Sequence, residues 1–265
     1  MTAPLHWVLQ TNLYSEEGWD TLVAALDKLG RPYSVHRVIP FSDGQPDPDP
    51  GLPDGARAIT MGSYTLAQYA AARGWRPGAY LDNLDFEVQR AHWGAHMLNA
   101  DAWVGPLRAY AGTPTPFFIR PVADTKAFVG QVMDLGELRA WQERLLAISP
   151  EDRPSLDGDT PIMAATKKTI YAETRTWIVG GRVVTASGYK LGTLPRQTPP
   201  DEVEPRITEF AQACADEWCP NRAFVLDVAD TDQGLRIVEI NNLNSAGFYK
   251  GVVNRLIAAI EQLEG

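Results

Sequence analysis

The chain of 265 residues has only two cysteines, and its 33 acidic residues outnumber its 24 basic ones. Cys214 and Cys219 are too few for a disulfide scaffold; we expect free thiols, with a C-x4-C zinc half-site as the weaker alternative. The net charge of −9 disfavours nucleic acid as a partner, because non-specific binding needs Lys and Arg to neutralise phosphates. No run approaches about 18 uninterrupted apolar residues, and the start MTAPLHWVLQ lacks the pattern of a secretory signal. We therefore expect a soluble cytoplasmic protein, with no membrane span and with a small-molecule site.

Several common signatures are also missing. The sequence contains neither G-x-x-x-x-G-K-[ST] nor G-x-G-x-x-G, which disfavours P-loop and Rossmann nucleotide binding. It contains no G-x-S-x-G elbow for a serine nucleophile. His92 and His96 are spaced i, i+4 on an expected helix, but the Glu of an H-E-x-x-H zinc site is absent. The chemistry must come from other residue types.

The apolar pattern changes near residue 85, and we predict two domains, 1–85 and 86–265, in an α/β chain. The first region alternates strands and helices, which favours a small parallel sheet. Its expected strands are His6–Gln10, Tyr33–Phe41 and Arg57–Met61, its helices are Ser15 to about Leu29 and Ser63–Arg73, and the proline-rich stretch Ser42–Gly55 is an expected exposed loop. The second region has strands and hairpins interrupted by single helices. Its expected strands are Phe117–Pro121, Ala127–Met133, Ile162–Thr166, Glu173–Val179, Arg182–Ser187, Ala223–Val228 and Leu235–Ile240, and its helices are Phe86–Ala100, Leu135–Ile148, Glu202–Trp218 and Val252–Leu263.

The segment AFVLDVADTDQGLRIVEINNLN (223–244) predicts a hairpin with paired carboxylates. A three-residue turn over 232–234, with Gly234 at positive φ, places Asp227 directly opposite Glu239. Asn241 returns to the same face two residues later. The other face then carries the apolar set Phe224, Leu226, Val228, Val238 and Ile240. Three hard oxygen donors suit Mg²⁺, and opposed carboxylates repel unless a cation separates them. The alternative is an ordinary solvent-exposed acidic face.

Three cations are candidates for binding a phosphate chain. Arg120 ends an apolar strand before Pro121, Lys126 follows in the next loop, and Lys190 follows the strand that ends at Ser187. Single cations at strand ends are usually only rim charges. Together beside a Mg²⁺ site they would form a clamp for a triphosphate.

With these residues in view, the chain resembles the ATP-grasp superfamily. The resemblance lies in IRP (119–121), ETRTWIVGGRVVTAS (173–187), GYK (188–190), FVLDV (224–228) and VEINNLNSAGF (238–248), and covers about residues 86–265. The first 85 residues resemble the Rossmann-like pre-ATP-grasp domain that usually precedes this fold. Arg120 stands where most members have lysine, and ADTKAF replaces their glycine-rich flap. Both departures are similar to a clade of small phage and bacterial members with an EIN-x-x-NSAGF ending, which are largely predicted peptide or amide ligases.

The resemblance implies that ATP binds between two lobes and that individual residues have family roles. For Mg²⁺ these are Asp227, Glu239 and Asn241; for phosphates Arg120, Lys126 and Lys190; for ribose Glu173; and for adenine the strand residues Met163, Ala164, Ala165 and Thr166. Arg175 would reach a phosphate or a substrate carboxylate, and Asn244 and Ser245 would face the acceptor.

The implied reaction is ATP-dependent amide or peptide ligation. The γ-phosphate would activate a carboxylate as an acyl phosphate, an amine would attack it, and ADP and phosphate would leave. Small-molecule or peptide carboxylates and amines are the expected partners. Two alternatives remain: a kinase that phosphorylates a small-molecule hydroxyl, and a nucleotide-binding regulatory module without turnover.

Overall fold

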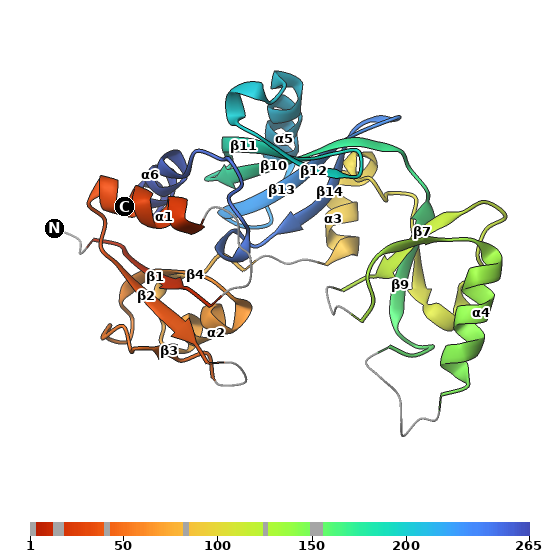
Figure 1. The fold of residues 1–265 in the computed structure, drawn as a ribbon, viewed down its shortest axis with the longest axis horizontal. Coiled ribbons are helices and arrows are strands. Elements are labelled where there is room, and N and C mark those ends of the chain that lie inside the picture. The colour runs from red at the N-terminus through yellow and green to blue at the C-terminus, as the bar shows by residue number, and fades with distance from the viewer. Residues whose placement is uncertain (1–3, 13–18, 40–42, 82–84, 124–126, 149–155) are drawn as a thin grey trace.

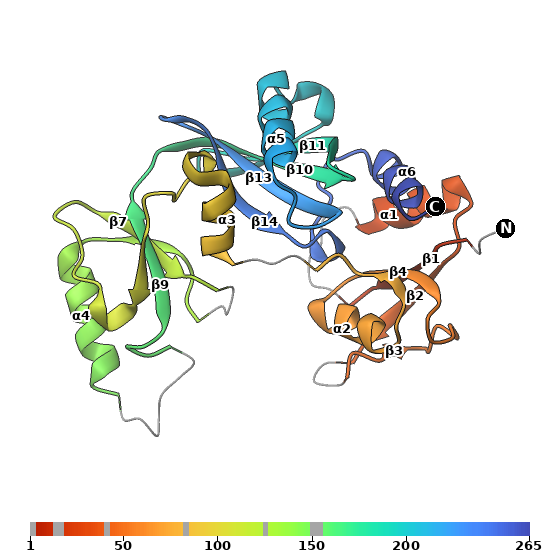
Figure 2. The ribbon, with the colours of Figure 1, turned by 180° about the vertical axis from the view of Figure 1, so that it is seen from behind.

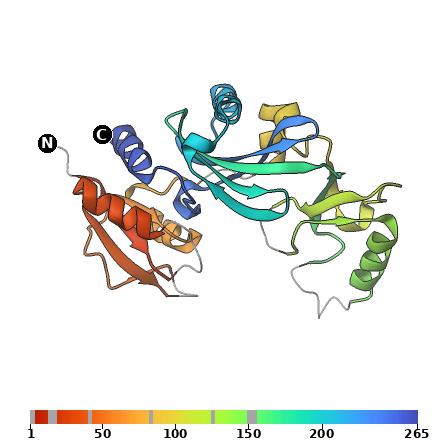
Figure 3. The same cartoon turned by 45° about the horizontal axis from the view of Figure 1, so that its top comes forward.

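The computed structural model describes residues 4–12, 19–39, 43–81, 85–123, 127–148 and 156–265. Among them, the strands form two five-stranded sheets and one four-stranded sheet. Figure 1 shows the first sheet and the four-stranded sheet at opposite ends of the molecule, with the second five-stranded sheet between them. The same order along the long axis is seen when the molecule is tilted (Figure 3).

The first sheet confirms the predicted parallel arrangement, with strand order β3-β2-β1-β4-β5. The strands β1 (His6–Gln10), β2 (Tyr33–Val38), β4 (Arg57–Met61) and β5 (Arg76–Gly78) run parallel, and β3 (Pro46–Asp47) pairs antiparallel with β2. The helices of this region are α1 (Trp19–Leu29) and α2 (Tyr64–Ala72). The side chain of Ser63 caps α2 by accepting a hydrogen bond from the Leu66 backbone N–H. The expected Ser15 cap lies outside the described residues.

The second sheet has the order β12-β11-β10-β13-β14, and its neighbouring strands are antiparallel. Its strands are β10 (Ile170–Val179), β11 (Arg182–Leu191), β12 (Leu194–Thr198), β13 (Ala223–Thr231) and β14 (Gly234–Asn241). One face, which includes Ile178, Phe224 and Leu226, packs against the helices α3 (Phe86–Trp93) and α5 (Pro205–Glu217). The helix predicted over Phe86–Ala100 stops at Trp93, because Gly94 has a φ of +48° and a short 3-10 turn follows.

The β13–β14 hairpin has the predicted pairing but a different turn. Its loop has two residues between the paired Thr231 and Gly234, and Gly234 has the expected positive φ, +89°. A β-bulge at Val238 then shifts the register by one residue, so that Asp227 still lies opposite Glu239. The bulge also exchanges the core residue. Ile237 is fully buried, whereas Val238 lines a pocket, so the assignment of Val238 to the apolar core was wrong.

The third sheet forms a smaller lobe with the order β6-β9-β7-β8. Its strands are β6 (Trp103–Pro106), β7 (Phe117–Pro121), β8 (Gln131–Met133) and β9 (Pro161–Thr166), and α4 (Leu135–Leu146) covers it. A capping box between Asp134 and Glu137 starts α4, and Leu138 packs against Phe117 and Ile119. The chain passes from β9 through residues 167–169 into β10, so this segment links the two lobes.

One hydrophobic core crosses the proposed boundary at residue 85. Trp7 and Leu26 belong to the same buried cluster as Trp177 and Ile257 of the later region. The closing helix α6 (Val253–Glu264) lies beside α1, as Figures 1 and 2 show. Within the described ranges, every helix is too short or too polar to cross a membrane.

Candidate functional site

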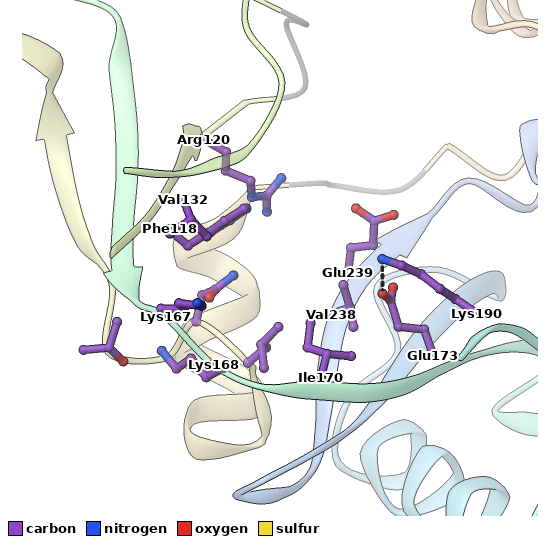
Figure 4. Close-up of a pocket in the computed structure, with 13 residues that line it drawn as sticks. Phe118, Arg120, Val132, Lys167, Lys168, Ile170, Glu173, Lys190, Val238 and Glu239 are labelled. Carbon is purple, nitrogen blue, oxygen red and sulfur yellow. Dashed lines mark hydrogen bonds and ion pairs between the residues drawn. The ribbon is translucent and has the colours of Figure 1, made fainter. Parts of the chain in front are cut away.

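A pocket of about 310 Å³ lies between the second sheet and the smaller lobe. Figure 4 shows Phe118, Val132 and Arg120 on its small-lobe side, and Glu173, Lys190 and Glu239 on the opposite side. Apolar side chains from both lobes (Leu98, Phe118, Val132, Ile170 and Val238) line part of it. The pocket therefore combines an apolar slot with a charged end, the composition expected of a small-molecule site.

A row of charged residues crosses three strands of the second sheet. The register places Arg175 of β10 opposite Asp227 of β13, and Asp227 opposite Glu239 of β14. The Nε and Nη2 atoms of Arg175 donate to the two carboxylate oxygens of Asp227 at 2.9 and 2.8 Å. Burial raises the pKa of Asp227 and the Arg175 bonds oppose that rise. Burial also works against the Arg175 charge, but the bonds to Asp227 outweigh it and raise the pKa of Arg175.

Asn241 connects the two candidate metal carboxylates. Its Nδ2 atom lies 3.2 Å from an oxygen of Asp227 and 3.2 Å from an oxygen of Glu239. Glu239 lines the pocket and, among the described residues, has no ion-pair partner. Burial, followed by the charge of Asp227, raises the pKa of Glu239, which is the behaviour of a carboxylate that lacks a cation.

These three side chains fit a magnesium ion in their chemistry, because two carboxylates and one amide offer hard oxygen donors. The described residues contain no cluster of three or more His, Cys, Asp or Glu suited to a metal, so the amide oxygen of Asn241 would have to contribute. Asp227 would share its oxygens with Arg175. Glu239, open to the pocket, is the donor that a cation would relieve most.

Glu173, the candidate ribose ligand, is held by two neighbours on β11. Lys190 Nζ and the Tyr189 hydroxyl donate to its two carboxylate oxygens, each at 2.6 Å. Consecutive strand residues normally point to opposite faces. A β-bulge at Tyr189, where Thr174 pairs with Gly188 and Glu173 with Lys190, brings both side chains to the same carboxylate. Strand β11 extends through Lys190, beyond the predicted end at Ser187.

Two stacked tyrosines enclose the Arg175 guanidinium. The rings of Tyr189 and Tyr249 are 5.2 Å apart and nearly parallel, at 8°. The guanidinium carbon of Arg175 lies 5.7 Å from the Tyr189 ring centre and 5.0 Å from that of Tyr249. Tyr249 is the one non-glycine residue with positive φ, +44°, in the described part of the chain. Such strain persists where the surroundings enforce it, commonly at functional sites.

The remaining candidates occupy distinct places. Arg120 lines the pocket, and its Nε lies 3.2 Å from the Met163 sulfur. Of the expected adenine strand, only Thr166 lines the pocket; Met163, Ala164 and Ala165 are buried within β9. Lys126 lies outside the described residues.

Asn244 and Ser245 do not come together at an open acceptor site. Asn244 is 3% exposed and fastens the first sheet. Its side chain accepts from the Tyr80 backbone N–H at 2.6 Å and donates to the Thr60 carbonyl, while its own carbonyl accepts from the Gly62 N–H at 2.7 Å. Ser245 is exposed.

The sequence-based interpretation missed the residues at the link between the lobes. Asp101 accepts hydrogen bonds from the Thr166 hydroxyl at 2.6 Å and its backbone N–H at 3.2 Å, and it pairs with Lys168. Lys167, Lys168 and Asn99 all line the pocket. The Lys167–Lys168 pair was a visible signal, whereas nothing local to Asp101 or Asn99 marks them.

Comparison with known proteins gives a consistent fold. A family model described as an ATP-grasp domain, family 3 of its clade, matches residues 32–260. No curated protein matches the sequence significantly. Among solved structures, the ATP-grasp ligase PsnB complexed with a minimal precursor is similar, with a TM-score of 0.60, 14% identity and 100% of each chain covered.

Two further structures show the same architecture. A RimK domain ATP-grasp protein from Sphaerobacter thermophilus has a TM-score of 0.60 and 14% identity, over 97% of this chain and 98% of that one. D-alanine–D-alanine ligase from Bacillus anthracis has a TM-score of 0.59 and 13% identity, over 99% and 100%. At such identities the likeness shows the fold alone. The family match spans most of the sequence, and the chain therefore belongs to this family of ATP-grasp domain proteins.

Proposed function

We propose that the chain is an ATP-dependent carboxylate–amine ligase that forms an acyl phosphate and releases ADP and phosphate. The observation that carries the proposal is the row of Asp227, Asn241 and Glu239 beside a pocket that also contains Arg120 and Lys190. Several ATP-grasp ligases share this fold, and one of them is titled as a complex with Mg and ADP. The acid and amine are small molecules or peptides in this proposal.

In the proposed site, Glu239, Asp227 and Asn241 hold Mg²⁺. When bound, Mg²⁺ offsets the negative charge of the phosphate oxygens. Arg120 binds phosphate oxygens directly from the small lobe. Lys190 is 40% exposed at its side chain, so its ammonium can turn from Glu173 to a phosphate at little cost. Glu173 then has a free oxygen for the ribose hydroxyls.

Arg175 is proposed to contact the reacting carboxylate. Its Nε and Nη2 atoms bind Asp227, and Nη1 has no hydrogen-bond partner among the described residues. A fixed guanidinium with one open donor can orient an acid beside the γ-phosphate, and positioning of two substrates is the main task of such an enzyme. We also propose the reducing cytoplasm as its compartment, because Cys214 and Cys219 are both free.

The deciding experiment traps the intermediate. Purified protein is incubated with Mg-ATP, hydroxylamine and pools of amino acids and short peptides. A hydroxamate together with ADP and free phosphate supports the ligase. A stable phosphoester without free phosphate identifies the alternative kinase, AMP and pyrophosphate identify a different ligase chemistry, and nucleotide binding without turnover identifies a regulatory module.

A further inference from the structure

Asn99 is a buried polar residue whose side chain has no hydrogen-bond partner among the described residues. It is 8% exposed and lines the pocket. Its backbone carbonyl, by contrast, accepts a hydrogen bond from the Ala102 N–H at 3.0 Å. Buried polar groups are normally paired, so an unpaired amide at a pocket wall calls for an explanation.

The segment around Asn99 is held independently of that amide. The Leu98 N–H donates to the Ile237 carbonyl of β14 at 2.8 Å, which attaches the segment to the second sheet. Two residues after Asn99, Asp101 binds Thr166 and Lys168 at the link between the lobes. Both lobes therefore fix the backbone that carries Asn99. Its amide is available to a ligand.

The surroundings of the amide suit a flat, uncharged ring. Leu98, Phe118, Val132 and Ile170 supply apolar surface to the pocket. Asp101 binds the ammonium of Lys168, whose side chain is 7% exposed, which leaves the link region with little free charge. The groups suited to phosphate and ribose, such as Lys190 and Glu173, lie on the other side of the pocket, away from Lys167 and Lys168 (Figure 4).

We infer that Asn99 contacts the edge of the purine base and favours a base that carries a ring nitrogen beside an exocyclic amino group. A carboxamide has an N–H donor and a carbonyl acceptor side by side, and this pair matches the adjacent ring nitrogen and amino group of adenine. The inference rests on the proposed function, in which a nucleoside triphosphate occupies the pocket. Asn99 acts on base selection; it takes no part in phosphoryl transfer.

The test is calorimetric binding of three probes with Mg²⁺: ATP, purine riboside triphosphate, which lacks the amino group, and tripolyphosphate, which lacks the base. Wild-type protein should bind ATP roughly tenfold more tightly than purine riboside triphosphate, equivalent to about 1.4 kcal/mol. In Asn99→Leu that ratio should approach one, with tripolyphosphate binding unchanged. Asn254→Leu on α6, outside the pocket, is the matched control and should keep the wild-type ratio.

Each other outcome overturns the inference. Equal binding of the two nucleotides by the wild-type chain does so without any variant, and so does a wild-type ratio in Asn99→Leu. Loss of tripolyphosphate binding in Asn99→Leu, in step with ATP, would mean that the substitution distorts the phosphate end. If the wild-type chain binds neither ATP nor tripolyphosphate, the proposed function itself fails, which is a distinct result.

Discussion

Arg175 and Asp227 form a two-point ion pair across neighbouring strands, with Nε–Oδ1 and Nη2–Oδ2 distances of 2.9 and 2.8 Å. The side chain of Arg175 is 10% exposed and that of Asp227 is fully buried. Two residues 52 positions apart in the sequence thus determine the electrostatics of the candidate metal site. Asp227 keeps its charge inside the protein because the guanidinium compensates it.

Asp227→Ala should lower the free energy of unfolding by about 3–5 kcal/mol, because it leaves the Arg175 charge buried without a partner. Urea denaturation measures the loss. The double variant Arg175→Met with Asp227→Leu should recover most of it, since well-packed apolar residues can replace a buried pair. Asp230→Ala on the same strand removes an exposed pair with Arg206 and should cost less than about 1 kcal/mol. A double variant no more stable than Asp227→Ala would contradict this explanation.

Glu239→Gln should leave the unliganded protein as stable as the wild type, or more stable. Glu239 has no ion-pair partner among the described residues, and burial disfavours its charge. The same change should abolish stabilisation by Mg-ATP, which at a hundredfold excess over Kd would be about 2.7 kcal/mol for the wild type. Thermal denaturation with and without Mg-ATP measures both effects. Marked destabilisation of the unliganded variant would show that Glu239 is structural.

Ile237→Ala and Val238→Ala should differ strongly despite being adjacent. The bulge buries Ile237 completely, so its truncation should cost about 2–5 kcal/mol through a core cavity. Val238 lines the pocket, and its truncation should cost less than about 1 kcal/mol while weakening nucleotide binding. Chemical denaturation of the two variants compares them directly; equal losses would indicate that the bulge is absent in solution.

Acid should destabilise the first sheet through His6. Burial and the neighbouring His36 lower the pKa of His6 below its ordinary value of 6.5. The unfolded chain therefore binds a proton near pH 6.5 that the folded chain takes up only at lower pH. Stability should be complete above about pH 7 and fall as pH decreases towards the folded-state pKa. Denaturation of wild type and His6→Asn at several pH values tests this, because the variant should show a shallower decline; parallel curves would exclude His6 as the source.

Much of the fold could be predicted, because secondary structure depends on local periodicity. The bounds of β1, β4 and β7 coincide with the predicted strands His6–Gln10, Arg57–Met61 and Phe117–Pro121. The turn at Gly180–Gly181 also formed as expected, with φ of +58° and +73°. Short strands such as β3 and β5 were missed, since two or three residues carry too little pattern to detect.

Bulges limited what the pattern could say about individual side chains. A period of two assigns every residue of a strand to a face, and one extra residue reverses the assignment from there on. This happened at Val238, which faces the pocket, and at Tyr189, which binds Glu173 together with Lys190. The predicted opposition of Asp227 and Glu239 held because the shorter turn and the bulge offset each other.

The sequence by itself determined the parallel first sheet, the carboxylate hairpin and the presence of Arg120 and Lys190 near it, because each follows from spacing within a few residues. Only the tertiary structure decided which charges are paired. It couples Arg175 to Asp227 and Asp101 to Lys168, and it leaves Glu239 and Asn99 open to the pocket. The physical reason is that ion pairing and burial depend on distances between strands remote in sequence, and local spacing carries no information about those distances.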